Sequence, residues 1–194
     1  MIAQLSGKFL YKSPTQLIMK VGGVGYEVNI SLNTYTVIQD KEEGELFTYL
    51  RVTEDALTIY GFFDLAEKQM FLQLLSVSGV GAATARMMLS SMKPVDIQHA
   101  IITGNIKLLE TVKGIGKKTA ERIALELKDK MNKQAATAIN ISSSYNTKQI
   151  DALEALVALG INRLTAEQTL KKVIEQYGES ANIEDLIKQV LKNI

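Results

Sequence analysis

A nine-residue motif occurs twice in this chain, 35 residues apart. The first copy, Val77–Ala85, reads VSGVGAATA, and the second, Val112–Ala120, reads VKGIGKKTA. Each copy has two glycines around an apolar residue, and each lies between segments with apolar residues at helical spacing. Glycine ends helices and forms tight turns, so the repeat predicts two pairs of helices, each joined by a tight turn.

The spacing of the second copy excludes two nucleotide-binding loops. A Walker A loop has glycine five positions before its last glycine, but Thr111 stands five positions before Gly116, and Lys118 rather than Lys117 precedes Thr119. A dinucleotide-binding fingerprint has a third glycine where this chain has Thr119. The pattern instead favours an anion site at a helix N-terminus, and the two lysines favour phosphate.

Paired turns of this kind resemble helix-hairpin-helix DNA-binding elements. In such elements the glycines let backbone amides approach a phosphate, while the apolar residue between them (Val80 or Ile115) anchors the turn in the core. These contacts recognise the sugar–phosphate backbone and carry no base sequence. The resulting candidate DNA-phosphate-binding residues are Gly79, Val80, Gly81, Gly114, Ile115, Gly116, Lys117, Lys118 and Arg122.

The two copies differ in charge. The second copy and its helix carry Lys113, Lys117, Lys118 and Arg122, whereas the first has only Arg86 further along. We therefore expect the second hairpin to account for most of the salt dependence of binding, and the first to bind through its amides. The net charge is only +1, but residues 107–130 hold seven Lys/Arg against four Asp/Glu, a local basic patch that fits a selective DNA-binding protein.

Residues 1–63 predict a small β domain. Gln16–Val21 and Tyr26–Ile30 alternate in polarity around a turn at Gly22–Gly25, and Leu46–Val52 and Ala56–Phe62 flank a second turn. Five or six short strands in such a segment indicate a closed barrel, of which the OB-fold is the commonest nucleic-acid-binding form.

The rest of the chain is predicted to be helical, except for one linker. Residues 64–131 have helical periodicity, with a break at Pro94. Residues 132–148 have no apolar period and are rich in Ser, Thr, Asn and Ala, so they predict a flexible linker in which the helical segment has already ended, near Met131.

Residues 149–194 predict a unit of three helices. Gly160 is expected to end the first helix, Thr165–Gln168 to begin the second as a capping box, and Asn182 to cap the third. A unit this small has little room for an active site, so a protein-binding module is predicted.

The composition excludes several kinds of chemistry. The chain has no Cys and one His, His99, which removes disulfide scaffolds, zinc ribbons and cysteine nucleophiles. No nucleophile–base pair is evident, so neither a catalytic residue nor a metal or cofactor is expected. Apolar runs are short and no signal sequence is evident, which predicts a soluble cytoplasmic protein.

The whole chain resembles the RuvA family, the DNA-binding subunits of the Holliday junction branch-migration complex. The segments that carry the resemblance are MIAQLSGKF, VGGVGYEV, TEDALTIYGFF, GVGAATA and GIGKKTAERIALELKDK. The resemblance implies a multidomain β + α fold. Its parts are an N-terminal OB-fold β-barrel (1–63), a central all-α tandem helix-hairpin-helix domain (64–131), a linker (132–148) and a C-terminal three-helix, UBA-like domain (149–194).

The function that the resemblance implies is sequence-independent binding of four-way (Holliday) junction DNA, in recombination and in repair as part of the SOS response. The implied partners are the hexameric ATPase RuvB, which drives migration, and the RuvC resolvase, and the implied assembly is a homotetramer or an octamer, with no membrane. Where the family has a Pro-Lys or similar pair after the first GxG, this chain has Ala82-Ala83, so the contribution of the first hairpin to affinity is in doubt.

The resemblance also assigns roles to two further groups. Glu54 and Asp55, which are otherwise a solvated hairpin tip, would form an acidic pin that repels phosphates at the junction centre. The C-terminal unit would bind RuvB. The candidate contact residues are Leu153, Leu156, Leu159, Leu170 and Ile174, although apolar residues at helical spacing also fill the core of such a unit.

Two other functions stay open at this stage. Helix-hairpin-helix motifs also occur in DNA repair enzymes such as glycosylases or nuclease subunits, but a glycosylase would need a positioned Asp after the hairpin, and the carboxylates there alternate with lysines as on a solvated face. A general RNA-binding OB protein would need more basic and aromatic residues in the barrel.

Overall fold

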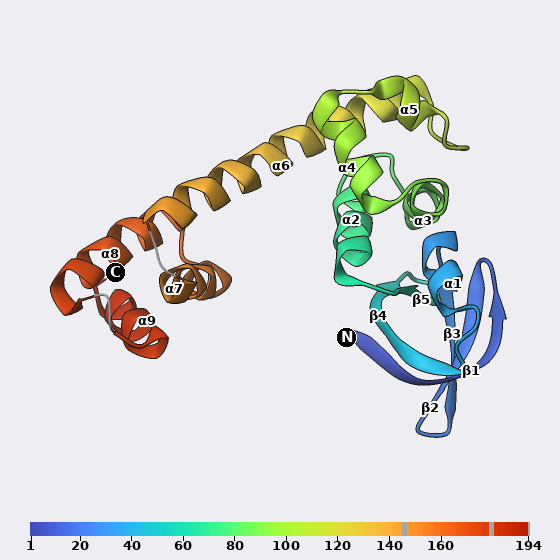
Figure 1. Cartoon of the computed structure of the whole chain (residues 1–194), viewed down its shortest axis with the longest axis horizontal. Helices are drawn as coiled ribbons and strands as arrows, with labels where there is room; N and C mark the ends of the chain where they lie inside the picture. Colours follow the sequence, from blue (N-terminus) through green and yellow to red (C-terminus); the bar gives the residue numbers. More distant parts are fainter. Residues whose placement is uncertain (145–146, 179–180, 194) are drawn as a thin grey trace. The chain divides into compact units, whose positions relative to one another are not determined.

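The computed structural model describes residues 1–144, 147–178 and 181–193. The chain divides into two compact units, residues 1–131 and residues 132–194, and each is described by itself. The first unit contains a β-barrel followed by helices, and the second contains helices (Figure 1).

The barrel confirms the closed OB-fold type of sheet expected for the N-terminal segment. Its strands follow the order β1-β2-β3-β5-β4, and β4 pairs with β1 to close it. Neighbouring strands are antiparallel, except that β3 and β5 are parallel. The strands are β1 (Gln4–Ser13), β2 (Gln16–Val21), β3 (Val24–Ile30), β4 (Glu43–Val52) and β5 (Leu57–Phe62). The barrel core is formed by Leu5, Leu17, Met19, Val28, Ile30, Ile38, Leu46 and Ile59.

The β2–β3 hairpin turns more tightly than expected. Gly22 and Gly23 have φ angles of 55° and 91°, a left-handed pair that suits a two-residue hairpin turn. Val24 and Gly25, which were expected to belong to the turn, already pair with β2.

A short helix, α1 (Leu32–Ile38), joins β3 to β4 and was not predicted. The Ser31 hydroxyl accepts a hydrogen bond from the Thr34 amide at the helix N-terminus, and Ile38 is buried in the barrel core. The segment LNTYTVI contains four β-branched residues, whose local preference is for strands. Burial of Ile38 and the N-cap therefore outweigh local propensity here.

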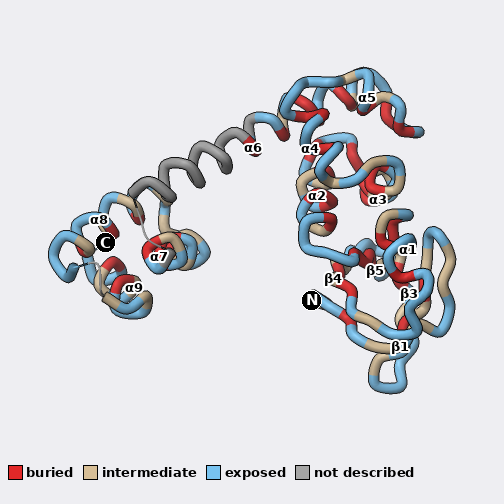
Figure 2. Tube along the Cα trace, in the orientation of Figure 1, coloured by how far each residue is buried: buried red, intermediate tan, exposed pale blue. Residues whose placement is uncertain are grey.

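The helices of the first unit pack as one core with the end of β5. They are α2 (Leu65–Leu75), α3 (Ala82–Ser91), α4 (Pro94–Thr103), α5 (Ile106–Glu110) and the part of α6 (Lys117–Ser144) up to Met131. Phe71 of α2 lies against the rings of Tyr60 and Phe62, with centroid distances of 5.1 and 4.9 Å. Pro94 is at the start of α4, which confirms the predicted break between helices. The buried positions are red in Figure 2.

Helix α6 is longer than expected. It continues past Met131 to Ser144, so the expected end of helical structure near Met131 is wrong. Residues 132–144 contain neither Gly nor Pro, the two strongest helix breakers, which explains why a segment without an apolar period still forms a helix. The flexibility of residues 132–148 stays a prediction, and residues 145–146 lie outside the described residues.

A buried carboxylate connects the barrel to the helices. Glu67 of α2 is 3% exposed, and it accepts hydrogen bonds from the hydroxyls of Ser31 and Thr34. Thr34 also accepts a hydrogen bond from the Phe63 amide at 3.0 Å. Burial raises the pKa of Glu67 above its ordinary value of 4.5, and nearby Asp64 raises it further, whereas the two hydroxyl donors lower it.

This raised pKa predicts a pH dependence of stability. Because folded Glu67 holds its proton more tightly than unfolded Glu67 does, its stabilising contribution is full below the unfolded pKa and is lost as the pH rises through the folded pKa. Urea unfolding of the wild type and of Glu67→Gln, from about pH 4 to about pH 8, measures this contribution. We expect the stability of the wild type relative to the variant to decrease with pH, and an increase would contradict the raised pKa.

The second unit contains the three helices that were predicted, α7 (Thr147–Ala158), α8 (Arg163–Tyr177) and α9 (Ile183–Lys192). Gly160 follows α7 in a left-handed conformation, as expected. Asn182 occupies the N-cap position of α9, but its side chain makes no capping hydrogen bond. The expected capping box at Thr165–Gln168 is wrong, because Asn162 caps α8 by accepting from the Leu164 amide and the helix begins at Arg163.

Candidate nucleic-acid interface

The two glycine turns of the repeat have the same backbone geometry. In the first, between α2 and α3, the Val80 amide donates to the Val77 carbonyl at 3.0 Å. In the second, between α5 and α6, Ile115 donates to Val112 at the same distance. The third residue of each turn is a glycine, and Gly79 and Gly114 have φ angles of 90° and 92°. This is the left-handed conformation that a type II turn requires at that position.

The apolar residues of both turns are anchored in the shared helical core. The valines that open the turns, Val77 and Val112, are each 2% exposed, and Val80 and Ile115 are each 5% exposed. The glycines beside them are exposed. Each turn is therefore anchored by two buried apolar side chains, and its glycine backbone lies at the surface.

The second glycine of each motif copy, which follows the turn, is not required by a left-handed φ or by packing. Gly81 has an ordinary extended conformation, and Gly116 is likewise outside the left-handed region. A Cβ atom built at either residue would meet no atom within 4 Å. Neither backbone strain nor packing within the unit accounts for these glycines, so we attribute them to the close approach of an external group.

Two helix N-termini begin directly after these glycines. The first bonds of the helices run from the Ala85 amide to the Gly81 carbonyl, at 2.9 Å, and from the Ala120 amide to the Gly116 carbonyl, at 3.0 Å. The amides of residues 82–84 and 117–119 therefore have no acceptor within their own helices. Such amides, with the positive end of the helix dipole, can bind an anion.

Basic side chains surround the second turn. Lys113, Lys117 and Lys118 are all exposed, the first within the turn and the others at the start of α6. Arg122 is also exposed, but its Nε donates to the Glu126 carboxylate at 2.8 Å. The structure thus brings the predicted glycines and lysines together, and it pairs the predicted Arg122 with a carboxylate.

The first turn lacks these side chains. Ala82 is buried and Ala83 is exposed, so the two positions that follow Gly81 present no cation. Arg86, one turn further along α3, donates hydrogen bonds to the barrel instead. The first turn can therefore bind an anion through its amides alone.

The predicted acidic pin lies at the tip of the β4–β5 hairpin. Glu54 and Asp55 are exposed there, and residues 51–57 are exposed throughout. The Thr53 amide donates to the Ala56 carbonyl at 2.9 Å, and the Thr53 hydroxyl donates to the Asp55 carboxylate at 3.0 Å. These bonds hold the two carboxylates on a tight, solvated turn.

Most of the predicted partner-binding residues belong to the core of the second unit. Leu153, Leu156 and Leu170 are fully buried, and Ile174 packs against the same cluster. Their spacing on the inner faces of α7 and α8 reflects this packing, so they are not available to a partner in this structure. Leu159 is 63% exposed and stays a candidate, together with the exposed Leu164, which the sequence reasoning did not identify.

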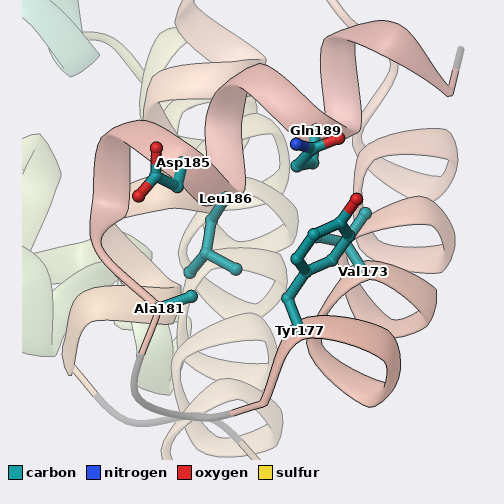
Figure 3. A pocket seen from close by; sticks show the side chains of 6 residues that line it. All are labelled: Val173, Tyr177, Ala181, Asp185, Leu186 and Gln189. Carbon is teal, nitrogen blue, oxygen red and sulfur yellow. The ribbon is translucent and has the colours of Figure 1, made fainter.

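The second unit also has a cavity of about 240 Å³ between α8 and α9. Figure 3 shows the Tyr177 ring on one side of it and the Asp185 and Gln189 side chains on the other. Val173, Ala181 and Leu186 complete its apolar lining. The cavity combines an apolar floor with polar side chains at its edge.

The described part of the chain contains neither a metal-binding cluster nor a membrane-spanning helix. Among the side chains that the structure describes, no group of three or more His, Asp or Glu could hold a metal ion. Within residues 1–144, 147–178 and 181–193, no helix has both the length and the apolar character needed to cross a bilayer.

Three family models match the chain in succession. Residues 1–61 match the RuvA N-terminal domain, residues 71–129 match a SAM-like helix-hairpin-helix tandem, and residues 148–194 match the RuvA C-terminal domain. The tandem match covers both glycine turns described above.

Curated proteins resemble the chain over its full length. The proteins from Cytophaga hutchinsonii and Amoebophilus asiaticus are 45% and 46% identical to it, and the matches cover 99% of this chain and 99% and 100% of theirs. A third, from Christiangramia forsetii, is 42% identical over 100% of both chains. All three carry the name Holliday junction branch migration complex subunit RuvA.

Proposed function

The chain belongs to the RuvA family, and we propose on this basis that it binds four-way DNA junctions and holds them for branch migration driven by the ATPase RuvB. The structural observation that best supports the proposal is the pair of glycine turns with matching geometry, each followed by a helix N-terminus. A repair-enzyme function is not favoured, because the full-length relatives carry the branch-migration name.

The two turns would bind phosphates by complementary means. Gly81 and Gly116 let the backbone approach a phosphate oxygen, and the amides that follow them donate to it. At the second turn, Lys117 and Lys118 add charge. Because these contacts involve backbone phosphates, binding would depend on the shape of the DNA and not on its bases.

A competition gel shift tests this function. The protein is bound to a synthetic four-way junction in the presence of EDTA, and excess linear duplex made from the same sequences is added. We expect the junction complex to persist, because a single duplex offers fewer simultaneous contacts. Equal competition by linear duplex would reduce the protein to a general DNA-binding protein and would contradict the proposal.

The second unit is proposed to bind RuvB, with residues 132–148 as the linker. The exposed Leu159 and Leu164 are its proposed contact residues, since both are large apolar side chains at the α7–α8 connection. Their exposure leaves apolar area that a partner could bury. Loss of RuvB binding in a Leu159→Ser, Leu164→Ser variant that still unfolds cooperatively would support this assignment, and unchanged binding would contradict it.

The assembly and its setting are part of the same proposal. A homotetramer would place four copies of the β4–β5 tip around one junction, and two tetramers would make an octamer. We also propose that the protein acts in recombination and SOS repair, in the cytoplasm and together with RuvC, as the resemblance to the family implies. Light scattering of the protein, free and junction-bound, distinguishes one tetramer from two, and a monomer in both would contradict the assembly.

The acidic tip leads to a prediction about migration. Glu54 and Asp55 are exposed and negatively charged, so they would repel DNA phosphates at the junction centre. The variant Glu54→Gln, Asp55→Asn is expected to bind the junction equally or more tightly, while RuvB-driven migration changes. Junction affinity and migration rate are measured in parallel, and a clear loss of affinity would contradict the repulsive role.

A further inference from the structure

Helix α3, which begins at the first glycine turn, is held on the barrel by side-chain hydrogen bonds. Nη1 of Arg86 donates to the Thr15 carbonyl and to Oδ1 of Asn29, both at 2.9 Å. Near the other end of the helix, Asn33 Nδ2 donates to the carbonyls of Leu89 and Met92, at 2.6 and 3.0 Å. These bonds connect one helix to three parts of the barrel segment: the β1–β2 turn, β3 and α1.

The charge of Arg86 contributes to this attachment. It stands near a proposed phosphate site, where a basic side chain would ordinarily be assigned to DNA, yet it donates hydrogen bonds to oxygens of the barrel segment. The equivalent position in the second copy of the repeat is Glu121, which is exposed. The cation is therefore found in the copy whose helix lies on the barrel, and an anion takes its place in the other copy.

The hydrogen bonds between α3 and the barrel are connected to the acidic tip through strands β3 and β5. Asn29 of β3 pairs with Tyr60 of β5, and β5 begins directly after the tip that carries Glu54 and Asp55. A hydrogen bond from Arg86 to Asn29 thus connects the helix behind the first turn to the strand that supports the tip.

We propose that Arg86 is a positioning residue for junction binding. This proposal rests on the function proposed above. It fixes the first glycine turn relative to the β4–β5 tip, so that both meet a four-way junction at once. Linear duplex needs no such alignment, because it does not engage the tip. The residue therefore affects selectivity for the junction and contributes no phosphate contact of its own.

The test compares four proteins: wild type, Arg86→Gln, Arg86→Lys and Asn29→Ala. Dissociation constants for a four-way junction and for linear duplex are measured over a range of KCl concentrations. For Arg86→Gln we expect about tenfold weaker junction binding, as for loss of one charge-assisted hydrogen bond, with duplex binding and the junction salt slope unchanged. Lysine can still donate to the same oxygens, so Arg86→Lys should recover most of the junction affinity.

Asn29→Ala separates positioning from charge. It removes the side-chain acceptor on β3 and leaves every charge in place. We expect it to reproduce the loss of junction selectivity, and the double variant Arg86→Gln, Asn29→Ala to lose little more than either single variant. If Arg86→Gln fails to unfold cooperatively on heating, Asn29→Ala and Arg86→Lys carry the comparison.

The outcomes separate this inference from the proposed function. A salt slope that falls by about 0.9 for both DNAs in Arg86→Gln would make Arg86 a phosphate ligand and would overturn the inference alone. Unchanged junction selectivity in Arg86→Gln would do the same. A wild type that fails to prefer the junction would overturn the proposed function first, and the inference with it.

Discussion

Replacement of Lys117 and Lys118 by alanine is expected to weaken junction binding by about 60-fold per protomer at 0.1 M salt, and by very little near 1 M. Each phosphate contact adds about 0.9 to the slope of log affinity against log salt, so two contacts give this factor. The salt slope itself should fall by about two units per protomer. Fluorescence anisotropy with labelled junction DNA over a range of KCl concentrations measures both quantities.

The fold should tolerate this change. Both lysines are exposed at the start of α6, where a positive charge is unfavourable to the helix dipole, so their removal should leave the free energy of unfolding equal or slightly higher. The matched control is Lys8→Ala, Lys20→Ala, which removes the same charge from the barrel. Lys8 and Lys20 face each other across β1 and β2, so this control also relieves a like-charge pair.

The control decides what the lysines do. If both variants lower the salt slope equally, net charge alone accounts for the effect, and no specific contact at the second turn is needed. If the slope is unchanged in Lys117→Ala, Lys118→Ala, neither lysine contacts phosphate. The assignment stands only if the slope falls in this variant and not in the barrel control.

The local features of the site could be predicted from the sequence because they depend on short-range geometry. A glycine with a left-handed φ, followed by a buried apolar residue and a helix start, is specified within nine residues. The second copy of the motif made the prediction specific, and the structure gives Gly79 and Gly114 nearly the same φ angle. The alternation of β2 and the break at Pro94 are local in the same sense.

The features that were missed depend on contacts between distant residues. Arg86 lies 57 residues from Asn29 in the chain, and Glu67 lies 36 residues from Ser31. No periodicity indicates such pairs, so the sequence predicts neither the barrel contact of Arg86 nor the buried carboxylate of Glu67. Helix α1 was missed for the same reason, because burial of Ile38 in the barrel stabilises a segment with strand propensity.

The candidate partner-binding leucines show what helical periodicity can and cannot predict. Leu153, Leu156 and Leu170 were considered because they are apolar and recur at helical spacing, and the structure buries all three. Periodicity identifies the inner face of a helix. It cannot identify exposed apolar residues such as Leu164, which lie outside the stripe, and these are the ones that a partner can reach.

Serine at the second glycine of both turns, Gly81→Ser with Gly116→Ser, is expected to abolish most DNA binding and leave the fold intact. A Cβ at either residue meets no atom within 4 Å beyond the two adjacent residues, and neither glycine has a left-handed φ. Serine is also a better helix N-cap than glycine, by a few tenths of a kcal/mol. The free energy of unfolding should therefore be unchanged or slightly higher.

DNA binding should fall for two reasons. The added Cβ and hydroxyl occupy the space that a phosphate would need, and the serine oxygen accepts from an amide of the first helical turn that would otherwise donate to the phosphate. Loss of one charge-assisted bond at each turn, at about 1.5 kcal/mol, weakens binding by about 3 kcal/mol, on the order of 100-fold. The salt slope should change little, because no charge is removed.

The matched control places the same serine two positions earlier, at the first glycine of each motif copy. Gly79 and Gly114 have φ angles of 90° and 92°, so serine there strains the turn and should cost about 1 kcal/mol or more per site in stability. Urea unfolding and junction binding of the two double variants then give opposite patterns. Full junction affinity in the stable Gly81→Ser, Gly116→Ser variant would mean that the open space above these glycines is not where DNA binds. A loss of affinity confined to that variant would show that the two turns contact the backbone of the junction.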